Sequence, residues 1–393
     1  MVPLLLAASA SATEKGGDWP TFRGSFARCG AVGETPRAPG GRLLWKFREP
    51  KLLERRPFAS SPAVAGSRVV IGSDSYRVYC LELATGKTAW RFDTKWPVFS
   101  SPAVANGRVY VGEGLHEHTD CKLYCLDLTN GKELWSIQTQ SHTESSPTVV
   151  AGRVYFGAGD DGLYCADALT GKVLWQHKGP HEDGCPLVAE GRVYAGSGYG
   201  FQGIVCVDAK DGSLVWKKEL PAPAWSGPSY ADGRLYAAIG KGTFTESARP
   251  PYGEVRCLDP KNGEDLWRFR EVKDAVLTAV AVTGGRAVFG SRDGGCYAVD
   301  AATGKLVWRS EVGSPVLSSP AVAGDAVLFG DDEGKLTCLR LKDGARLWAM
   351  DTSDDVVVFA PDPRILSSPA VAGGRVVFGS SNGMVYCVGG EAK

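Results

Sequence analysis

The segment Asp300-Ala301-Ala302-Thr303-Gly304-Lys305-Leu306-Val307-Trp308 decides the fold, because close copies of it return along the whole chain. One such copy is Thr129-Asn130-Gly131-Lys132-Glu133-Leu134-Trp135. The tryptophans that end the copies are spaced by 45, 45, 40, 41, 51, 41 and 40 residues, and they are Trp45, Trp90, Trp135, Trp175, Trp216, Trp267, Trp308 and Trp348. Self-similarity at a fixed period of this length is typical of repeat architectures.

A second phrase repeats between these tryptophans. Ser60-Ser61-Pro62 recurs at Ser100-Ser101-Pro102, Ser145-Ser146-Pro147, Ser318-Ser319-Pro320 and Ser367-Ser368-Pro369, with weaker copies at Gly184-Cys185-Pro186, Ser226-Gly227-Pro228 and Leu277-Thr278-Ala279. Each unit reads as short alternating strands separated by Gly turns, such as Gly107-Arg108-Val109-Tyr110 and then Tyr124-Cys125-Leu126-Asp127. Four strands in about 40–45 residues are typical of a propeller blade.

The sequence therefore predicts an all-β, eight-bladed β-propeller of four-stranded antiparallel blades over residues 42–388. The chain begins on the last strand of a unit (Arg42–Phe47) and ends after the third strand of another (Val385–Val388). These two ends are expected to share one blade, because closure removes the open sheet edges. The Trp side chains are expected to pack flat between blades, each contributing about 2–3 kcal/mol by burial. Residues 13–41 are expected to form an extended segment, and residues 389–393 a tail.

Composition excludes two classes of protein. The chain is 44% hydrophobic and 22% charged, which is too apolar for a disordered chain. Lys plus Arg number 44 and Asp plus Glu number 44, so the chain lacks the excess positive charge with which nucleic-acid binders neutralise phosphates. No stretch reaches the roughly 18 apolar residues of a membrane helix. Residues 1–12 are apolar, end in Ala-Ser-Ala and lack a basic start, which predicts a weak or truncated secretory leader, with an ordinary terminus as the alternative.

Seven of the eleven cysteines occupy one slot of the third strand, namely Cys80, Cys125, Cys165, Cys206, Cys257, Cys338 and Cys387. Equivalent atoms of neighbouring blades are too far apart for a disulfide, which needs Cα atoms within about 7 Å. These seven are predicted to be buried free thiols. Cys29, Cys121, Cys185 and Cys296 fall outside the slot, and only they could pair or react.

The segment 300–308 resembles the tryptophan-docking repeat of quinoprotein dehydrogenases and of non-enzymatic, BamB-type members of the pyrroloquinoline-quinone-like (PQQ-like) repeat family. The opening Asp18-Trp19-Pro20-Thr21-Phe22-Arg23-Gly24 is similar to that of many bacterial members. The resemblance covers residues 18–388 and implies an extracytoplasmic, periplasmic or secreted protein. It says little about activity, because the repeated residues build the scaffold.

The resemblance leaves catalysis unsupported. Quinoprotein dehydrogenases hold a quinone and a calcium ion, use an Asp base, and often carry a disulfide between adjacent cysteines. This chain has no Cys-Cys pair and lacks the large insertions that cap the quinone in those enzymes. We expect a monomeric, non-catalytic binding or scaffold module for a protein, peptide or small ligand. The alternative is a small PQQ-dependent oxidoreductase.

The five histidines lie between residues 116 and 181, within predicted blades 2 to 4. His116 and His118 belong to the second-to-third connection of blade 2. The repeat register makes His181 equivalent to His142 and Asp183 equivalent to Glu144. In blade order, the predicted position equivalent to His142 holds Pro57, Pro97, His142, His181, Pro223, Asp274, Pro315 and Arg364. The predicted position equivalent to Glu144 holds Ala59, Phe99, Glu144, Asp183, Trp225, Val276, Leu317 and Leu366.

Imidazole and carboxylate groups from two adjacent blades should therefore converge at the channel mouth. This mixture suits a divalent metal such as Zn²⁺, with His116, His118, His142 and His181 as candidate ligands, or a polar ligand bound by His142, Glu144, His181, Asp183 and Trp225. The alternative is a hydrated polar rim without a ligand. Insertions at Ser197–Gly203, with Tyr199 and Phe201, and at Gly240–Gly253, with Phe244, Arg249 and Tyr252, lie on the same predicted face. The loop face of blades 2–5 is thus the predicted working face.

Overall fold

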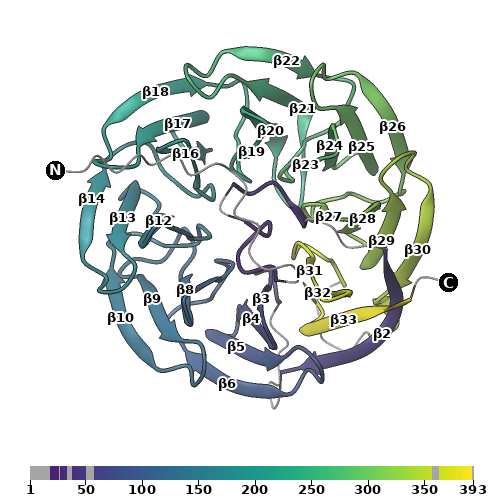
Figure 1. The fold of residues 1–393 in the computed structure, drawn as a ribbon. Helices are drawn as coiled ribbons and strands as arrows, with labels where there is room; N and C mark the ends of the chain where they lie inside the picture. Colours follow the sequence, from purple (N-terminus) through teal and green to yellow (C-terminus); the bar gives the residue numbers. More distant parts are fainter. Residues whose placement is uncertain (1–17, 26, 33–37, 50–56, 356–362, 392–393) are drawn as a thin grey trace, which may run out of the picture.

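A computed structural model describes residues 18–25, 27–32, 38–49, 57–355 and 363–391. Eight blades of four antiparallel strands each form a closed ring, which confirms the predicted propeller (Figure 1). Within the described ranges the one helical element is a short 3-10 turn at Ser353–Asp355, and no helix is long and apolar enough to cross a membrane. The leader expected over residues 1–12 lies outside the described residues.

Seven of the blades are formed from consecutive strands, numbered outward from the centre of the ring. Blade 1 consists of β3(Ala63–Ala65), β4(Arg68–Ser73), β5(Arg77–Glu82) and β6(Thr88–Asp93), and blade 2 of β7(Ala103–Ala105), β8(Arg108–Gly112), β9(Lys122–Asp127) and β10(Glu133–Gln138). Blade 3 consists of β11(Thr148–Val150), β12(Arg153–Gly157), β13(Leu163–Asp167) and β14(Val173–His177), and blade 4 of β15(Leu187–Ala189), β16(Arg192–Ser197), β17(Gly203–Asp208) and β18(Leu214–Glu219). Blade 5 consists of β19(Ser229–Ala231), β20(Arg234–Gly242), β21(Ser247–Leu258) and β22(Asp265–Phe269), and blade 6 of β23(Ala281–Thr283), β24(Arg286–Gly290), β25(Gly295–Asp300) and β26(Leu306–Glu311). Blade 7 consists of β27(Ala321–Ala323), β28(Ala326–Gly330), β29(Lys335–Arg340) and β30(Arg346–Asp351).

The two ends of the chain complete blade 8, as the split repeat predicted. This blade holds β31(Ala370–Ala372), β32(Arg375–Ser380), β33(Met384–Glu391) and, as its outer strand, β2(Pro39–Arg48). Leu43 pairs with Val388 and Phe47 with Val385 in an antiparallel ladder. The ring is therefore closed by backbone hydrogen bonds between residues more than 300 positions apart.

Each repeat tryptophan docks on the next blade, at the turn before its outer strand in seven cases and, for Trp348, at the start of the outer strand β2 itself. The indole Nε1–H of Trp267 in blade 5 donates to the carbonyl oxygen of Ala301 in blade 6, at 3.0 Å. The equivalent bond is present at all eight tryptophans, with lengths from 2.8 to 3.2 Å. The indole ring also covers the Gly of that turn, so that a Cβ atom on Gly304 would lie 2.6 Å from Cε3 of Trp267. The repeated Gly and Trp are thus two halves of one contact between blades.

The Ser-Ser-Pro phrase builds a second, inner set of contacts. Ser60 Oγ accepts the N–H of Gly72 in its own blade and donates to the carbonyl of Ser100 in the next. The N–H of Ser61 donates to Ser101 Oγ, and the ring closes where the N–H of Ser368 donates to Ser61 Oγ. The side chains of this phrase therefore connect the inner strands of neighbouring blades.

These contacts correct the predicted register of blade 6 by one residue. Thr278 Oγ1, rather than an atom of Leu277, accepts the N–H of Gly290 as the first Ser does elsewhere, and the N–H of Ala279 donates to Ser319 Oγ. The slots assigned to Asp274 and Val276 therefore belong to Ala275 and Leu277. The prediction was wrong here because no Ser or Pro in blade 6 marks the register. With Ala275 in the slot, blades 3 and 4 stand out further from the apolar and proline pattern.

The N-terminal segment crosses the centre of the ring (Figure 1). The carbonyls of Trp19, Pro20, Ala27, Cys29 and Gly30 accept N–H groups from the inner strands of blades 1, 2, 5, 6 and 7, respectively, and β1(Ala31–Val32) pairs with β27. In blades 3 and 4 the carbonyls of Ser146 and Pro186 accept hydrogen bonds from the buried guanidinium of Arg28. Within the described ranges, the centre of the ring is thus occupied by the chain itself.

All eleven cysteines are free, and the seven in the third-strand slot are buried, as predicted. Cys80 pairs with Trp90 in the neighbouring strand, and Cys165 pairs with Trp175 in the same way. Burial raises the pKa of both thiols, to about 12 for Cys80 and about 11 for Cys165. These cysteines therefore act as small apolar side chains.

Replacing Gly304 by Ala should destabilise the ring by about 2–4 kcal/mol, because the new methyl group meets the indole of Trp267 and the backbone has a φ of +72°. Gly284 is the matched control, since it also has a positive φ, +55°, but nothing lies within 4 Å of its Cβ position. Gly284→Ala should cost about 1 kcal/mol. Urea unfolding of both variants measures the difference, and equal losses would contradict the docking role of the Gly.

Asp331 should make stability depend on pH. Its carboxyl is buried between β28 and β29, with Oδ2 lacking a hydrogen-bond partner, and burial raises its pKa to about 6, against the opposing effect of the N–H groups of Lys335 and Glu333. The folded state therefore binds this proton more tightly than the unfolded state, so stability falls as pH rises from about 4 to 6. The loss is up to about 3 kcal/mol.

Asp331→Asn keeps an acceptor for these N–H groups and removes the charge. It should raise the melting temperature at pH 7.5 and change it little at pH 4. The exposed Asp325, changed to Asn, serves as the control and should show no such difference. A pH-independent effect of Asp331→Asn would contradict the assignment of the buried charge.

Candidate functional site

Three histidines from blades 2, 3 and 4 meet at the inner rim of the ring. The ring centroids of His116 and His142 are 4.5 Å apart, those of His142 and His181 are 5.1 Å apart, and those of His116 and His181 are 5.4 Å apart. His142 and His181 each precede the inner strand of their blade, and His116 reaches in from the β8–β9 connection. These three histidines therefore converge as the repeat register predicts. Together with Asp183 they form what we call the histidine cluster.

His118 does not join the histidine cluster; it braces the loop that carries His116. Its Nδ1 accepts the N–H of Leu115 at 3.1 Å, and its own N–H donates to the carbonyl of Leu115 at 2.8 Å. Its ring packs on Trp96 with 4.2 Å between centroids. The indole Nε1–H of Trp96 donates to the carbonyl of Thr119 at 3.2 Å, which fixes the other end of the loop.

The turn between β12 and β13 positions the two inner-strand histidines. Asp161 Oδ2 accepts the N–H of Gln140, at 2.7 Å, and so holds the segment that leads to His142. Asp160 Oδ1 lies 2.6 Å from His181 Nδ1, across the boundary between blades 3 and 4. Sequence reasoning missed Asp160. A signal was available, because this turn connects the second and third strands and so lies on the same face as His142 and His181.

Asp183 lies at the centre of the histidine cluster. Its Oδ1 is 2.8 Å from His142 Nε2 and 3.0 Å from His181 Nε2, and its Oδ2 is 3.8 Å from His116 Nε2. Asp183 Oδ2 and His181 Nε2 are both buried and have no hydrogen-bond partner, since the 3.0 Å approach to Asp183 lacks hydrogen-bond geometry. One donor atom from each of the four side chains lies within 4.8 Å of all the others.

The pKa values of the titratable groups in and beside the histidine cluster are shifted from their ordinary values. Burial alone would lower the pKa of His181, but the neighbouring carboxylates of Asp183 and Asp160 raise it to about 9. Burial would raise the pKa of Asp183, but His142 and His181 hold it down, to about 2. Burial lowers the pKa of His116. Burial, followed by the negative charge of Asp183, raises the pKa of Glu144 to about 8.

Glu144 and Trp225 lie next to the histidine cluster rather than within it. Glu144 Oε1 is 3.4 Å from His116 Nε2. Trp225 contacts the cluster through Tyr199, whose ring centroid is 4.9 Å from that of Trp225 and 4.7 Å from that of His116. Tyr199 comes from the β16–β17 insertion and covers the imidazoles of His116 and His181.

The opposite side of the inner rim is apolar. Ala275, Leu277 and Leu317 from blades 6 and 7 form a buried cluster, with Trp225 and Leu366 packed against it. Leu277 is 4% exposed and Leu317 3%, so these side chains fill the rim. The inner rim therefore has a mainly apolar side in blades 5 to 8, which Arg364 and its ion-pair partner Asp332 interrupt, and a histidine–carboxylate side in blades 2 to 4.

The blade 5 insertion does not reach the histidine cluster. It extends β20 and β21 as one long hairpin, in which Gly242 pairs with Ser247, rather than forming a loop. The guanidinium of Arg292 in blade 6 donates to the carbonyls of Thr243, at 3.2 Å, and Thr245, at 2.7 Å. The hairpin is thus bound to blade 6, with Phe244 and Arg249 exposed and Tyr252 half-buried.

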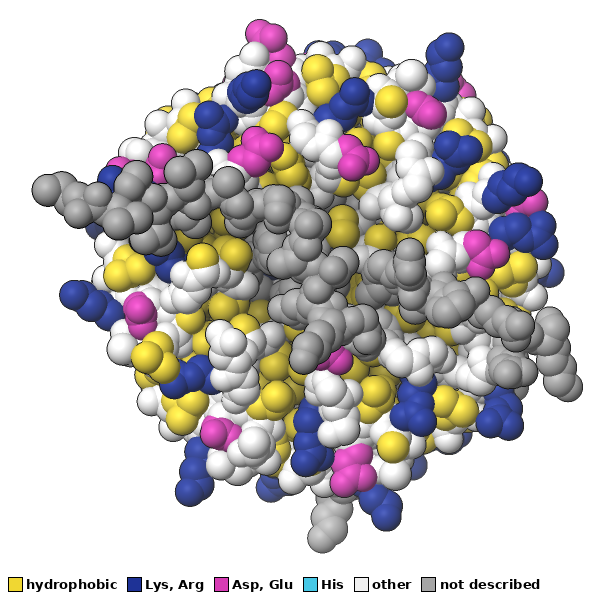
Figure 2. All heavy atoms as spheres, viewed as in Figure 1, with side chains coloured by type: hydrophobic (Ala, Val, Ile, Leu, Met, Phe, Trp, Pro, Cys, Tyr) yellow, Lys and Arg dark blue, Asp and Glu magenta, His cyan; other side chains and the backbone are white. Residues whose placement is uncertain are grey.

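Cys121 and His177 are also outside the histidine cluster. Cys121 is a free, buried thiol, and burial raises its pKa to about 12, so it is not poised as a thiolate ligand. His177 ends β14, where its Nδ1 lies 3.0 Å from the carbonyl oxygen of Gly212. The face of the ring drawn in Figure 2 shows Lys and Arg side chains around its edge and, among the described side chains visible there, no histidine.

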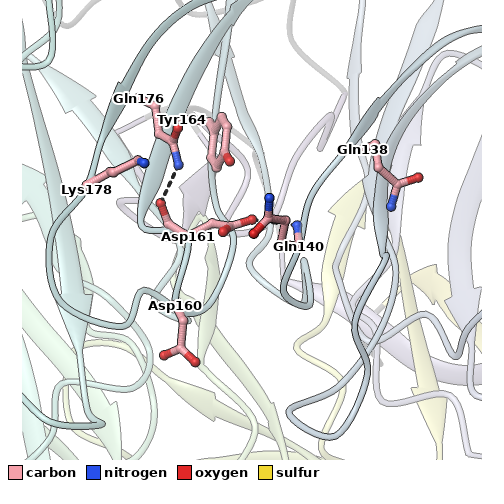
Figure 3. A pocket seen from close by; sticks show the side chains of 7 residues that line it. All are labelled: Gln138, Gln140, Asp160, Asp161, Tyr164, Gln176 and Lys178. Carbon is pink, nitrogen blue, oxygen red and sulfur yellow. Dashed lines mark hydrogen bonds between the residues drawn. The ribbon is translucent and has the colours of Figure 1, made fainter.

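A polar pocket of about 260 Å³ adjoins the histidine cluster between blades 2 and 3 (Figure 3). Asp160, the partner of His181, lies at one end of it, and Gln140 and Asp161 lie side by side within it. The pocket is lined by Gln138, Gln140, Asp160, Asp161, Tyr164, Gln176 and Lys178. Amide and carboxylate groups of this kind can hold water or a small polar ligand.

A family model described as "Outer membrane protein assembly factor BamB" (PQQ_2) matches residues 32–120, 115–185, 177–248 and 251–391. These matches span most of the chain. The protein therefore belongs to this family of PQQ-like repeat propellers.

Partial similarity extends to quinoprotein dehydrogenases. The chain is 36% identical over 63 residues to a lanthanide-dependent methanol dehydrogenase of Methylacidiphilum fumariolicum, a match that covers 16% of this chain and 10% of that protein. It is 30% identical over 98 residues to the quinohemoprotein alcohol dehydrogenase ADH IIB of Pseudomonas putida, covering 22% of this chain and 13% of that protein. The matches thus span at most a small part of these relatives.

Solved structures share the fold. BamB from Moraxella catarrhalis superposes with a TM-score of 0.70 at 17% identity, covering 89% of this chain and 98% of that one. The quinohemoprotein alcohol dehydrogenase of Comamonas testosteroni superposes with a TM-score of 0.72 at 16% identity, covering 96% and 81%. At these identities the likeness concerns the propeller fold alone.

Proposed function

We propose that the protein is an extracytoplasmic, monomeric and non-catalytic binding propeller whose ligand docks at the inner rim of blades 2 to 5. The observation that carries the proposal is the division of this rim. Histidine and carboxylate groups from blades 2 to 4 face the apolar residues of blades 5 to 8, with Tyr199 and Trp225 between them. The family description as an assembly factor supports a binding role and an extracytoplasmic location.

The residues present do not fit the quinone that the dehydrogenase relatives use. Pyrroloquinoline quinone carries three carboxylates, and the polar side of the rim already holds the carboxylate of Asp183. Repulsion between neighbouring negative charges disfavours binding of the quinone there. On the other side Leu277 and Leu317 are already buried against each other and would have to separate to admit a planar ring system.

Cofactor reconstitution tests the non-catalytic proposal. The protein is incubated with pyrroloquinoline quinone and Ca²⁺, and in parallel with a lanthanide ion, and then gel-filtered. We expect no stoichiometric quinone absorbance in the protein fraction and no dye-linked oxidation of primary alcohols. Retention of one quinone per chain with turnover of the dye would contradict the proposal and establish the oxidoreductase alternative.

Tyr199 provides a test of the docking position. Its side chain is 48% exposed although its ring lies against His116, which suits a residue that contacts a ligand. Tyr199→Ala should weaken binding of any ligand identified by screening at least tenfold, since aromatic anchors commonly contribute 2 kcal/mol or more, about 30-fold. Phe244→Ala, an equally exposed aromatic on the blade 5 hairpin, is the matched control and should change affinity little. A larger loss of affinity in Phe244→Ala than in Tyr199→Ala would instead place the docking position on the blade 5 hairpin.

A further inference from the structure

We propose that His116, His142, His181 and Asp183 bind one divalent transition-metal ion of the Zn²⁺ type. The inference deepens the proposed function, because it specifies the chemistry of the same rim. One donor atom from each of the four side chains lies within 4.8 Å of the others, and two of the contacts to Asp183 Oδ1 are already 2.8 and 3.0 Å. In a tetrahedral zinc site with bonds of about 2.0–2.1 Å, ligand atoms lie about 3.3 Å apart, so small side-chain rotations complete the site.

Two buried atoms without hydrogen-bond partners indicate a ligand between the four side chains of the histidine cluster. Asp183 Oδ2 and His181 Nε2 are buried and lack hydrogen-bond partners, although each is a strong hydrogen-bonding group. Leaving such groups unpaired in the interior is unfavourable, and more so when they are charged. An ion bound between the four side chains would satisfy both atoms at once. The alternative, a hydrated polar rim without a ligand, does not require buried polar atoms without partners to converge.

The surroundings of the imidazoles are those of metal ligands. His181 Nδ1 lies 2.6 Å from Asp160 Oδ1, and His142 Nδ1 lies 3.3 Å from Ser141 Oγ. Hydrogen bonds at Nδ1 orient the ring and direct Nε2 toward the ion, as in carboxylate–histidine–zinc arrangements. In both residues Nε2 is the atom that faces Asp183.

The donor set selects the class of ion. Three imidazole nitrogens and one carboxylate suit Zn²⁺ and neighbouring transition metals, whereas Ca²⁺ and Mg²⁺ prefer sites made of oxygen atoms. Glu144 Oε1, 3.4 Å from His116 Nε2, lies close enough to become a fifth ligand or to accept a hydrogen bond from a molecule on the ion. The ion would also join three blades, since its histidines come from blades 2, 3 and 4.

Calorimetric titration of the tag-free chain with ZnCl₂ tests the site. We expect one Zn²⁺ per chain. His116→Ala removes the most exposed ligand and so leaves the fold least disturbed, and Asp183→Asn keeps the side-chain volume. Each should weaken binding at least about 100-fold, and Asp160→Asn, which acts through His181, about 10–100-fold. Loading with Co²⁺ should give the intense visible bands of a four- or five-coordinate ion in the wild type and weaken them in these variants.

His177→Ala is the matched control, because His177 is an imidazole outside the histidine cluster whose Nδ1 lies 3.0 Å from the carbonyl oxygen of Gly212. This variant should bind Zn²⁺ within about threefold of the wild type. The absence of stoichiometric binding to the wild type, or an equal loss in His177→Ala and His116→Ala, would overturn the metal site. Failure to bind Zn²⁺ together with failure to retain the quinone would remove the metal site and leave the proposed binding function standing.

Discussion

The contact between a tryptophan and the turn glycine of the next blade holds this propeller together. The indole covers a Gly that has no Cβ, and its N–H donates to a carbonyl of the same turn, as with Trp267 on Gly304 and Ala301. Because the contact joins each blade to its neighbour, no blade completes its own packing. The last of these contacts, from Trp348 to Pro39, depends on closure by the N-terminal strand β2. Stability is thus a property of the closed ring rather than of any one blade.

The same construction explains why the histidine cluster can exist. The Ser-Ser-Pro phrase and the Trp–Gly pair set the position of each inner strand, so the residues just before that strand are free to vary. In blades 3 and 4 these residues are His142 and His181, and their imidazoles meet across the boundary between the blades. A rigid scaffold therefore places donors from separate repeats within reach of one ion, without a dedicated loop motif.

The repeats made most of the fold predictable, whereas the details of the site depend on contacts that a periodic pattern does not contain. The spacing of the tryptophans and Ser-Ser-Pro phrases predicted eight blades, the shared blade 8 and the approach of His142 to His181. It failed at blade 6, where Thr278 replaces the marker Ser. It also grouped His118 with His116, because the stacking of His118 on Trp96 depends on the shape of one irregular loop. Asp160 was missed because an aspartate in a turn is common and its partner, His181, lies in the next blade.

X-ray absorption at the zinc edge tests the metal site directly, because it reports the atoms around the ion rather than its affinity. The protein is loaded with one equivalent of Zn²⁺ and gel-filtered before the measurement. We expect retained zinc with four or five nitrogen and oxygen neighbours at about 2.0–2.1 Å, and the outer-shell scattering of three imidazole rings. Zinc surrounded by water oxygens without imidazole scattering, or zinc lost on gel filtration, would contradict the metal site.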